Sequence, residues 1–107
     1  MPEIPPVIAA YFGTPPDAGA DMLRAIFTDD AHVRDEAHDH VGIDAIRAWR
    51  VETYARTPFT VRPLEQRTAG HAVVVRAEVS GTFPGSPVML DHRFELTGGR
   101  IASLDIG

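Results

Sequence analysis

The chain has 107 residues and a net charge of −5, and 44% of its residues are hydrophobic, so we expect one globular domain over residues 1–107. Ten arginines spread among fifteen acidic residues provide no basic face for nucleic acid, and no apolar run is long enough to cross a bilayer. The lack of cysteine excludes disulfides and thiolate chemistry. We read no signal peptide at the N-terminus and expect a cytoplasmic protein, and the arginine, alanine and proline usage without lysine suggests a GC-rich bacterial source.

The first half of the chain predicts three helices. The first begins at Pro5–Pro6, carries apolar residues at helical spacing and ends at Gly13. The second follows Asp17, a plausible N-cap, and is broken by "TDD" at residues 28–30. The third runs from about Ile43 to Tyr54. Before it, "AHVRD" predicts a short extended segment and "EAHDHVG" an irregular polar turn.

The second half changes to a period of two, which is typical of half-buried strands. The turn signals between them are "GTFPGSP" and Gly98–Gly99, which predicts a tight hairpin. Helices followed by an antiparallel sheet make the fold class α+β, with the helices covering one face of the sheet. We expect strands at residues 60–68, 71–81, 88–96 and 100–106.

The third expected strand, "VMLDHRFEL", alternates apolar and charged side chains. Leu90 and His92 fall on its apolar face, whereas Asp91 falls on its charged face. The outward position gives Asp91 a cross-strand ion pair with Arg76. Asp105, on the last strand, faces either a pocket or a dimer partner.

This layout resembles the nuclear transport factor 2-like superfamily, and within it SnoaL-like and ketosteroid isomerase-like proteins. The resemblance is carried by "VIAAYF", "LRAIFTDDAHVRD", "VGIDAIRAW" and "GTFPGSPVMLDHRFELTGGRIASLDIG", which together cover nearly the whole chain. It implies a cone-shaped, cystatin-like fold in which a curved, mainly antiparallel sheet wraps a long helix beside an apolar pocket. Homodimers are common in this superfamily, and its members include isomerases, cyclases and non-catalytic binding proteins, so enzyme activity is left open.

The resemblance also assigns candidate catalytic residues. Asp35 stands where ketosteroid isomerase-like proteins carry their general base, and burial in an apolar pocket would raise its pKa toward the useful range. Tyr11 stands where the family has a hydroxyl donor to the developing oxyanion; it also fits the apolar stripe of its helix. The family's third group, an acid, corresponds to Asp91, but the alternation directs Asp91 outward and leaves His92 as a pocket acid or base, or as a hydrogen-bonded core residue.

Other residues are expected to line the pocket without a chemical role. Leu90 lies on the inward face of its strand, and Phe83 sits in the long hairpin. Trp49 and Tyr54 lie on the third helix, which forms the pocket wall in the resembled family, and His40 is expected at the pocket mouth.

The cluster "HDH" at residues 38–40 also invites a metal site. His38 and His40 are two residues apart in an expected loop, with no helical ligand spacing after them. We therefore interpret the segment as a polar turn and expect no metal and no cofactor. His32 and His71 are expected on the surface.

These features lead to two competing functions. The first is an enzyme with a cofactor-free proton transfer, of isomerase or cyclase type, on a small apolar carbonyl compound. Asp35 would be its base, and Tyr11 or His92 would stabilise the oxygen that gains charge. The alternative is a non-catalytic pocket for a hydrophobic ligand, or a dimeric scaffold domain. In neither case do we expect nucleic acid or a membrane as partner.

Overall fold

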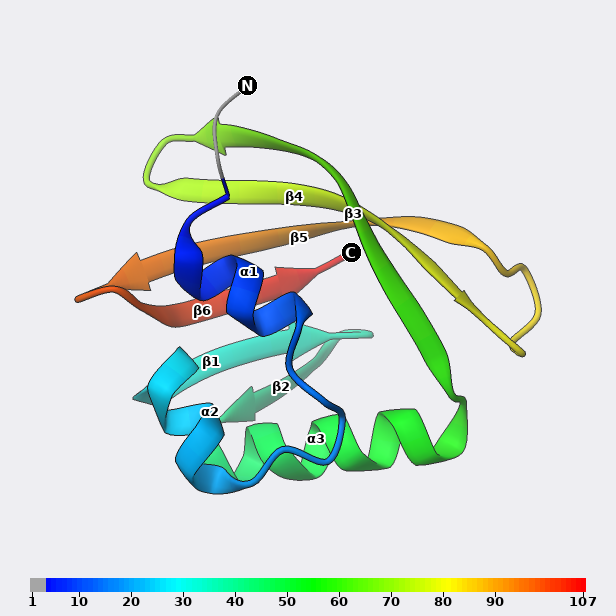
Figure 1. Cartoon of the computed structure of the whole chain (residues 1–107), viewed down its shortest axis with the longest axis horizontal. Helices are drawn as coiled ribbons and strands as arrows, with labels where there is room; N and C mark the ends of the chain where they lie inside the picture. The colour runs from blue at the N-terminus through cyan, green and yellow to red at the C-terminus, as the bar shows by residue number, and fades with distance from the viewer. Residues whose placement is uncertain (1–3) are drawn as a thin grey trace.

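The computed structural model describes residues 4–107 (Figure 1). Residues 4–107 form three helices and six strands. The predicted α+β class is confirmed. None of the helices within the described residues is long and apolar enough to span a bilayer. The elements in chain order are α1 (Pro6–Phe12), α2 (Ala20–Ile26), β1 (Phe27–Asp35), β2 (His38–Val41), α3 (Ile43–Arg56), β3 (Phe59–Ala69), β4 (Ala72–Gly81), β5 (Val88–Thr97) and β6 (Arg100–Ile106).

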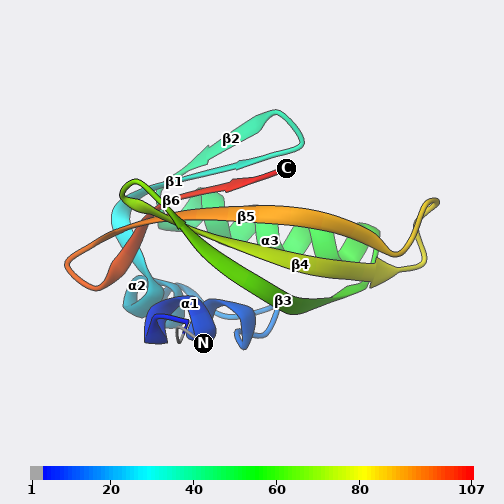
Figure 2. The same ribbon diagram turned by 90° about the horizontal axis from the view of Figure 1, so that it is seen from above.

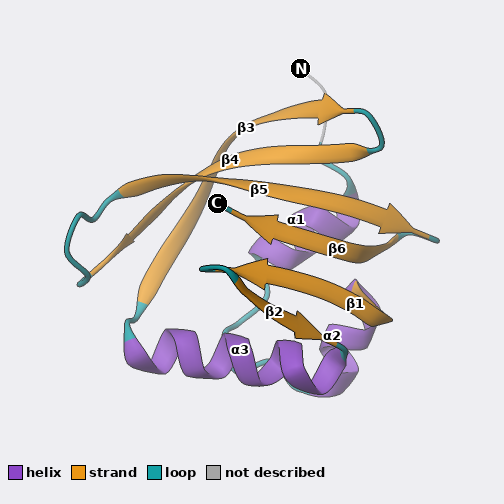
Figure 3. Cartoon of the chain, turned by 180° about the vertical axis from the view of Figure 1, so that it is seen from behind, coloured by secondary structure: helices purple, strands orange, loops and turns teal. Residues whose placement is uncertain are grey.

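The six strands form one curved sheet in the order β2-β1-β6-β5-β4-β3 (Figure 2). The pair β1 and β6 is parallel, and every other neighbouring pair is antiparallel. The helices lie on one side of this sheet, and α3 runs beside β1 and β2. Seen from behind, the strands lie in front of α1 (Figure 3). The cystatin-like arrangement of three helices on a mainly antiparallel sheet is thereby confirmed.

Apolar side chains from the inner face of the sheet and from all three helices form the core. Phe27 and Phe94 are its largest fully buried residues. Ile8 from α1, Leu23 from α2 and Ile46 from α3 pack on them without solvent exposure. These positions follow the periods read from the sequence, because only side chains on the inner faces leave water.

The connections also follow local chemistry. Pro6 occupies the first turn of α1, where its missing N–H costs no hydrogen bond. Gly98 and Gly99 join β5 to β6 with φ values of 59° and 80°, a conformation that favours glycine at both turn positions. The predicted tight hairpin is confirmed at this place.

Three local predictions are wrong. Asp17 does not cap α2, whose N-cap is Gly19 with no side-chain hydrogen bond. The extended segment starts at Phe27 instead of Ala31, so "TDD" belongs to β1. Most of the expected polar turn forms the strand β2, and the turn itself has only two residues, Glu36 and Ala37. Since β2 is a mostly exposed edge strand, it has no buried face and shows no apolar alternation.

Candidate functional site

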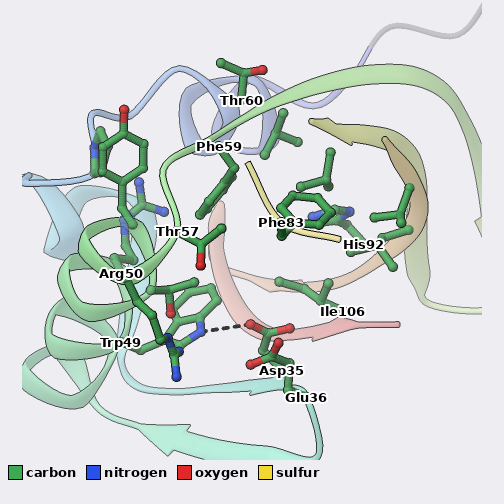
Figure 4. A pocket seen from close by; sticks show the side chains of 18 of the residues that line it. Asp35, Glu36, Trp49, Arg50, Thr57, Phe59, Thr60, Phe83, His92 and Ile106 are labelled. Carbon is green, nitrogen blue, oxygen red and sulfur yellow. Dashed lines mark hydrogen bonds between the residues drawn. The ribbon is translucent and has the colours of Figure 1, made fainter. Parts of the chain in front are cut away.

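A cavity of about 1010 Å³ lies between the sheet and the helices. Its wall is made by the ends of α1 and β1, the second half of α3, the start of β3, the hairpin between β4 and β5, and the end of β6. Figure 4 shows its side chains from close by. Seven residues that the sequence suggested for the site border this cavity: Tyr11, Asp35, Trp49, Tyr54, Phe83, Leu90 and His92.

His40 is the exception among the suggested residues. It is not among the residues that line the cavity, and its ring stacks on Trp49 at 5.7 Å between centroids with an interplanar angle of 26°. His40 therefore contacts a residue of the cavity wall, and its expected place at the pocket mouth stays a prediction.

Asp35 ends β1 and is half-buried at the cavity wall. The indole Nε1–H of Trp49 donates a hydrogen bond of 3.1 Å to its Oδ2 (Figure 4). Burial raises the pKa of Asp35 above its ordinary value, since the charged form loses hydration. The bond from Trp49 lowers this pKa, the charge of Glu36 raises it, and that of His40 lowers it. Asp35 therefore holds a proton more readily than a solvated aspartate.

Tyr11 is buried on α1, with 8% of its surface exposed. Its ring makes edge contacts with Phe12 at 5.2 Å, Phe27 at 5.9 Å and Phe94 at 5.5 Å, and the Arg50 guanidinium lies 5.4 Å from its centroid. Burial raises the pKa of Tyr11 to about 12, and Arg50 lowers it less than burial raises it. The hydroxyl therefore keeps its proton and can donate a hydrogen bond.

His92 is the one buried polar residue among those described, with 3% of its surface exposed. Its ring lies 5.4 Å from that of Phe12, and its Nδ1 is buried with no hydrogen-bond partner within residues 4–107. Burial lowers the pKa of His92, although the carbonyls of Leu90 and Val75 and the charge of Asp91 act in the opposite direction. The imidazole is therefore neutral near pH 7.

The register of the sheet relates Asp35 to His92. Ile106 on β6 is the cross-strand partner of Asp35 on β1 and also of His92 on β5. Since neighbouring strands lie about 4.8 Å apart, the two backbones are separated by about 10 Å, with Ile106 between them. Partners at one register share a face, and all three residues border the cavity. Asp35 and His92 thus flank Ile106 without a direct bond between them among the described contacts.

Asp91 and Asp105 lie outside the cavity. Asp91 forms ion pairs with Arg76 at 3.4 Å and Arg67 at 3.5 Å, which confirms the predicted outward position and the pair with Arg76. Asp105 is exposed on the other face of the sheet, in a shallow depression of about 220 Å³ that Arg34 and Arg93 also line. Of the two directions left open for Asp105, the pocket is thereby excluded.

The segment "HDH" is divided between the two faces of the sheet. Asp39 faces outward, accepts hydrogen bonds from Arg34 at 3.1 Å and lies 2.9 Å from Nε2 of His32, and these contacts lower its pKa. His40 turns to the helix side against Trp49. Within residues 4–107, no group of three or more His, Asp or Glu side chains is placed to hold a metal ion. His32 and His71 are exposed, as expected.

Several cavity residues carried no clear sequence signal. Arg50 donates to the carbonyls of Thr14 at 3.0 Å and Pro15 at 3.3 Å, and so ties α3 to the loop after α1. Glu36 borders the cavity from an exposed turn. The alternation of β4 and the final strand could have indicated Val79 and Ile106, which lie on inward faces. The places of Arg50 and Glu36 at the cavity could not be read from the sequence, because they depend on contacts between distant elements.

Solved structures resemble this fold closely. A Sinorhizobium meliloti protein provisionally described as a polyketide cyclase is 39% identical, with a TM-score of 0.89 over 97% of this chain and 95% of that one. A Catenulispora acidiphila protein with a ketosteroid isomerase-like fold, solved with trimethylamine, is 20% identical, with a TM-score of 0.79 over 98% and 86%. The epoxide hydrolase/cyclase-like enzyme SalBIII, of pyran ring formation in salinomycin, is 21% identical, with a TM-score of 0.74 over 94% and 85%.

The fold is the one seen in ketosteroid isomerase-like and nuclear transport factor 2-like proteins of known structure. More specifically, residues 10–104 match the SnoaL-like domain, and the chain belongs to the SnoaL-like family. No protein of curated function matches it.

Proposed function

We propose that the chain is an enzyme that moves a proton without a cofactor on a small, largely apolar carbonyl compound, in an isomerisation or a cyclisation. The observation that carries the proposal is the desolvated carboxylate of Asp35 at the wall of an aromatic-lined cavity. A carboxylate with a raised pKa is a better base than a solvated one, and it loses less hydration when a ligand covers it. The provisional description of the Sinorhizobium meliloti relative as a polyketide cyclase agrees with this reaction class.

In the proposed step, Asp35 takes a proton from the carbon next to the carbonyl. The electron pair of that C–H bond moves to the carbonyl oxygen, and an enolate forms. An isomerase returns the proton from Asp35 to another carbon of the ligand. In a cyclase the enolate carbon attacks a second carbonyl carbon of the same molecule, the π electrons of that C=O bond move to its oxygen, and the alkoxide takes the proton from Asp35. Neither path needs an oxidant or a metal to balance.

The enolate oxygen needs a hydrogen-bond donor that is already in place. His92 is one candidate, because its neutral ring borders the cavity and a ligand resting on Ile106 would lie between Asp35 and His92. Tyr11 is the other, since its hydroxyl stays protonated and its pKa responds to the charge of Asp35. Tyr11→Phe and His92→Phe, compared for the rate at saturating ligand, distinguish the two donors.

The test is deuterium exchange at the α-carbon of small apolar ketones in D2O, followed by proton NMR. Asp35→Asn keeps the shape of the side chain and should lower the exchange rate by about 10²- to 10⁴-fold, the usual contribution of a general base. Asp39→Asn is the matched control, since it removes a carboxylate from the same hairpin on the outer face. Exchange at the same rate in the wild type and in Asp35→Asn would refute the assignment of the base.

A second candidate is binding of a hydrophobic ligand without catalysis, which the rings of Phe59 and Phe83 on the cavity wall favour. This function needs the cavity and not the charge of Asp35. Ligand affinity unchanged in Asp35→Asn, together with no exchange above background in the wild type, would support it.

A further inference from the structure

The hydrogen bond between Trp49 and Asp35 joins two elements that are far apart in the chain. It connects α3 to the last residue of β1 across fourteen positions of sequence, and both residues border the cavity. Within residues 4–107, Trp49 is the side-chain donor to Asp35, and the backbone N–H of Glu36 also donates to this carboxylate. Two arginines of the neighbouring elements bind other groups: Arg34 binds Asp39, and Arg50 binds two carbonyls of the loop after α1.

We propose that Trp49 is the positioning residue of this site: its indole N–H holds Oδ2 of Asp35 and thereby presents the other oxygen of the carboxylate to the ligand. This inference rests on the proposed function of Asp35 as the base. Trp49 itself takes part in no proton transfer, because an indole N–H is a donor that does not ionise in the working range of pH.

The neutral charge of the donor explains why a tryptophan suits this place. An arginine or lysine in contact with Asp35 would hold it strongly in the charged form and depress its pKa, which would weaken it as a base. The indole fixes the direction of the carboxylate and adds no charge. Burial therefore still dominates, and the pKa of Asp35 stays above its ordinary value.

The surroundings hold both partners in place. His40 stacks on the Trp49 ring from β2, so that the indole is fixed between α3 and the β1–β2 hairpin. Asp35 pairs with His38 and with Ile106 on either side, which fixes its backbone. Three groups share the electrostatic environment of Asp35: Glu36 from the turn, His40 from β2 and, through its coupling to the carboxylate, Tyr11 from α1.

Trp49 is the single tryptophan of the chain, so its indole N–H gives one assigned signal in a proton–nitrogen NMR spectrum. In the wild-type protein without ligand, we expect this signal to shift with pH as Asp35 titrates. An inflection should persist at lower pH in Glu36→Gln and at higher pH in His40→Gln, because these charges raise and lower the pKa of Asp35, and it should vanish in Asp35→Asn. A flat indole signal through the titration of Asp35 would overturn the proposal without any variant that risks unfolding.

The second measurement is the pKa of Asp35 in Trp49→Phe, which keeps a ring for His40 to stack on and lacks the N–H. Loss of a hydrogen bond to a charged group should raise this pKa by about one to two units. The pH profile of exchange should shift by the same amount, and the maximal rate should fall about tenfold with little change in KM. Tyr54→Phe, on the same helix and without a contact to Asp35, should leave the pKa of Asp35 in place.

The outcomes separate this inference from the proposed function. If Asp35→Asn abolishes exchange and Trp49→Phe leaves both the pKa and the profile unmoved, Asp35 is the base and the positioning role is refuted. If Trp49→Phe moves the pKa of Asp35 while Asp35→Asn leaves exchange unchanged, the indole positions a carboxylate that is not the base, and the proposed function fails.

Discussion

Replacement of Ala37 by glycine should stabilise the protein. Glu36 and Ala37 form the two-residue turn between β1 and β2 with φ values of 53° and 63°, and neither is a glycine. In this left-handed region the Cβ approaches the following carbonyl oxygen, at a cost of about 1–2 kcal/mol per residue. Glycine removes that contact but loses about 0.5–1 kcal/mol more conformational entropy on folding. The net gain for Ala37→Gly is about 1 kcal/mol.

For a chain of this size, a gain of about 1 kcal/mol corresponds to a rise in Tm of about 4–8 °C. The assay is thermal unfolding followed by far-UV circular dichroism, with urea unfolding as a second measure of the free energy. Ala10→Gly, an exposed position within α1, is the matched control and should destabilise by about 0.5–1 kcal/mol. A Tm for Ala37→Gly at or below the wild-type value would refute the reasoning, because the turn would then carry no strain at this residue.

Three further changes test the site and the core. Asp35→Asn should raise Tm at pH 7. The pKa of Asp35 is higher in the folded than in the unfolded protein, so the wild type loses stability as pH rises through the folded pKa, whereas the variant does not. The difference in Tm should vanish below about pH 3.9, the pKa of an aspartate in the unfolded chain. Phe94→Ala should cost about 3–5 kcal/mol in urea unfolding, since Phe94 is fully buried. Asp91→Asn should cost less than about 1 kcal/mol and leave α-proton exchange unchanged, because its ion pairs with Arg76 and Arg67 are partly exposed.

The inward and outward positions on β5 could be predicted because strands have a period of two. Alternation in "VMLDHRFEL" gave Asp91 to the charged face and His92 to the apolar face, and the structure agrees with both. The period holds because the side chains of a strand must separate between core and water. The same reasoning could not find β2, whose residues are mostly exposed on both faces and whose pairing comes from backbone hydrogen bonds to β1.

The candidate site was predictable in its members and not in its geometry. The resemblance indicated Asp35 and Tyr11, the alternation of β5 indicated His92, and all three border the cavity. Their roles stay predictions until the exchange experiments are done. The direction of the His40 ring could not be predicted, because it depends on the stacking contact with Trp49, a residue of another element.

The sequence by itself determined the α+β class and the faces of the regular strands, because periodicity and turn residues act over short stretches of chain. Its resemblance to SnoaL-like proteins indicated the family, which the match over residues 10–104 confirms. Only the tertiary structure decided that Trp49 binds Asp35, that Ile106 lies between Asp35 and His92, and that Arg50 ties α3 to the loop after α1. Each of these relations joins residues distant in sequence, and it depends on the rotation of α3 and the register of three strands, which packing of the whole chain fixes together.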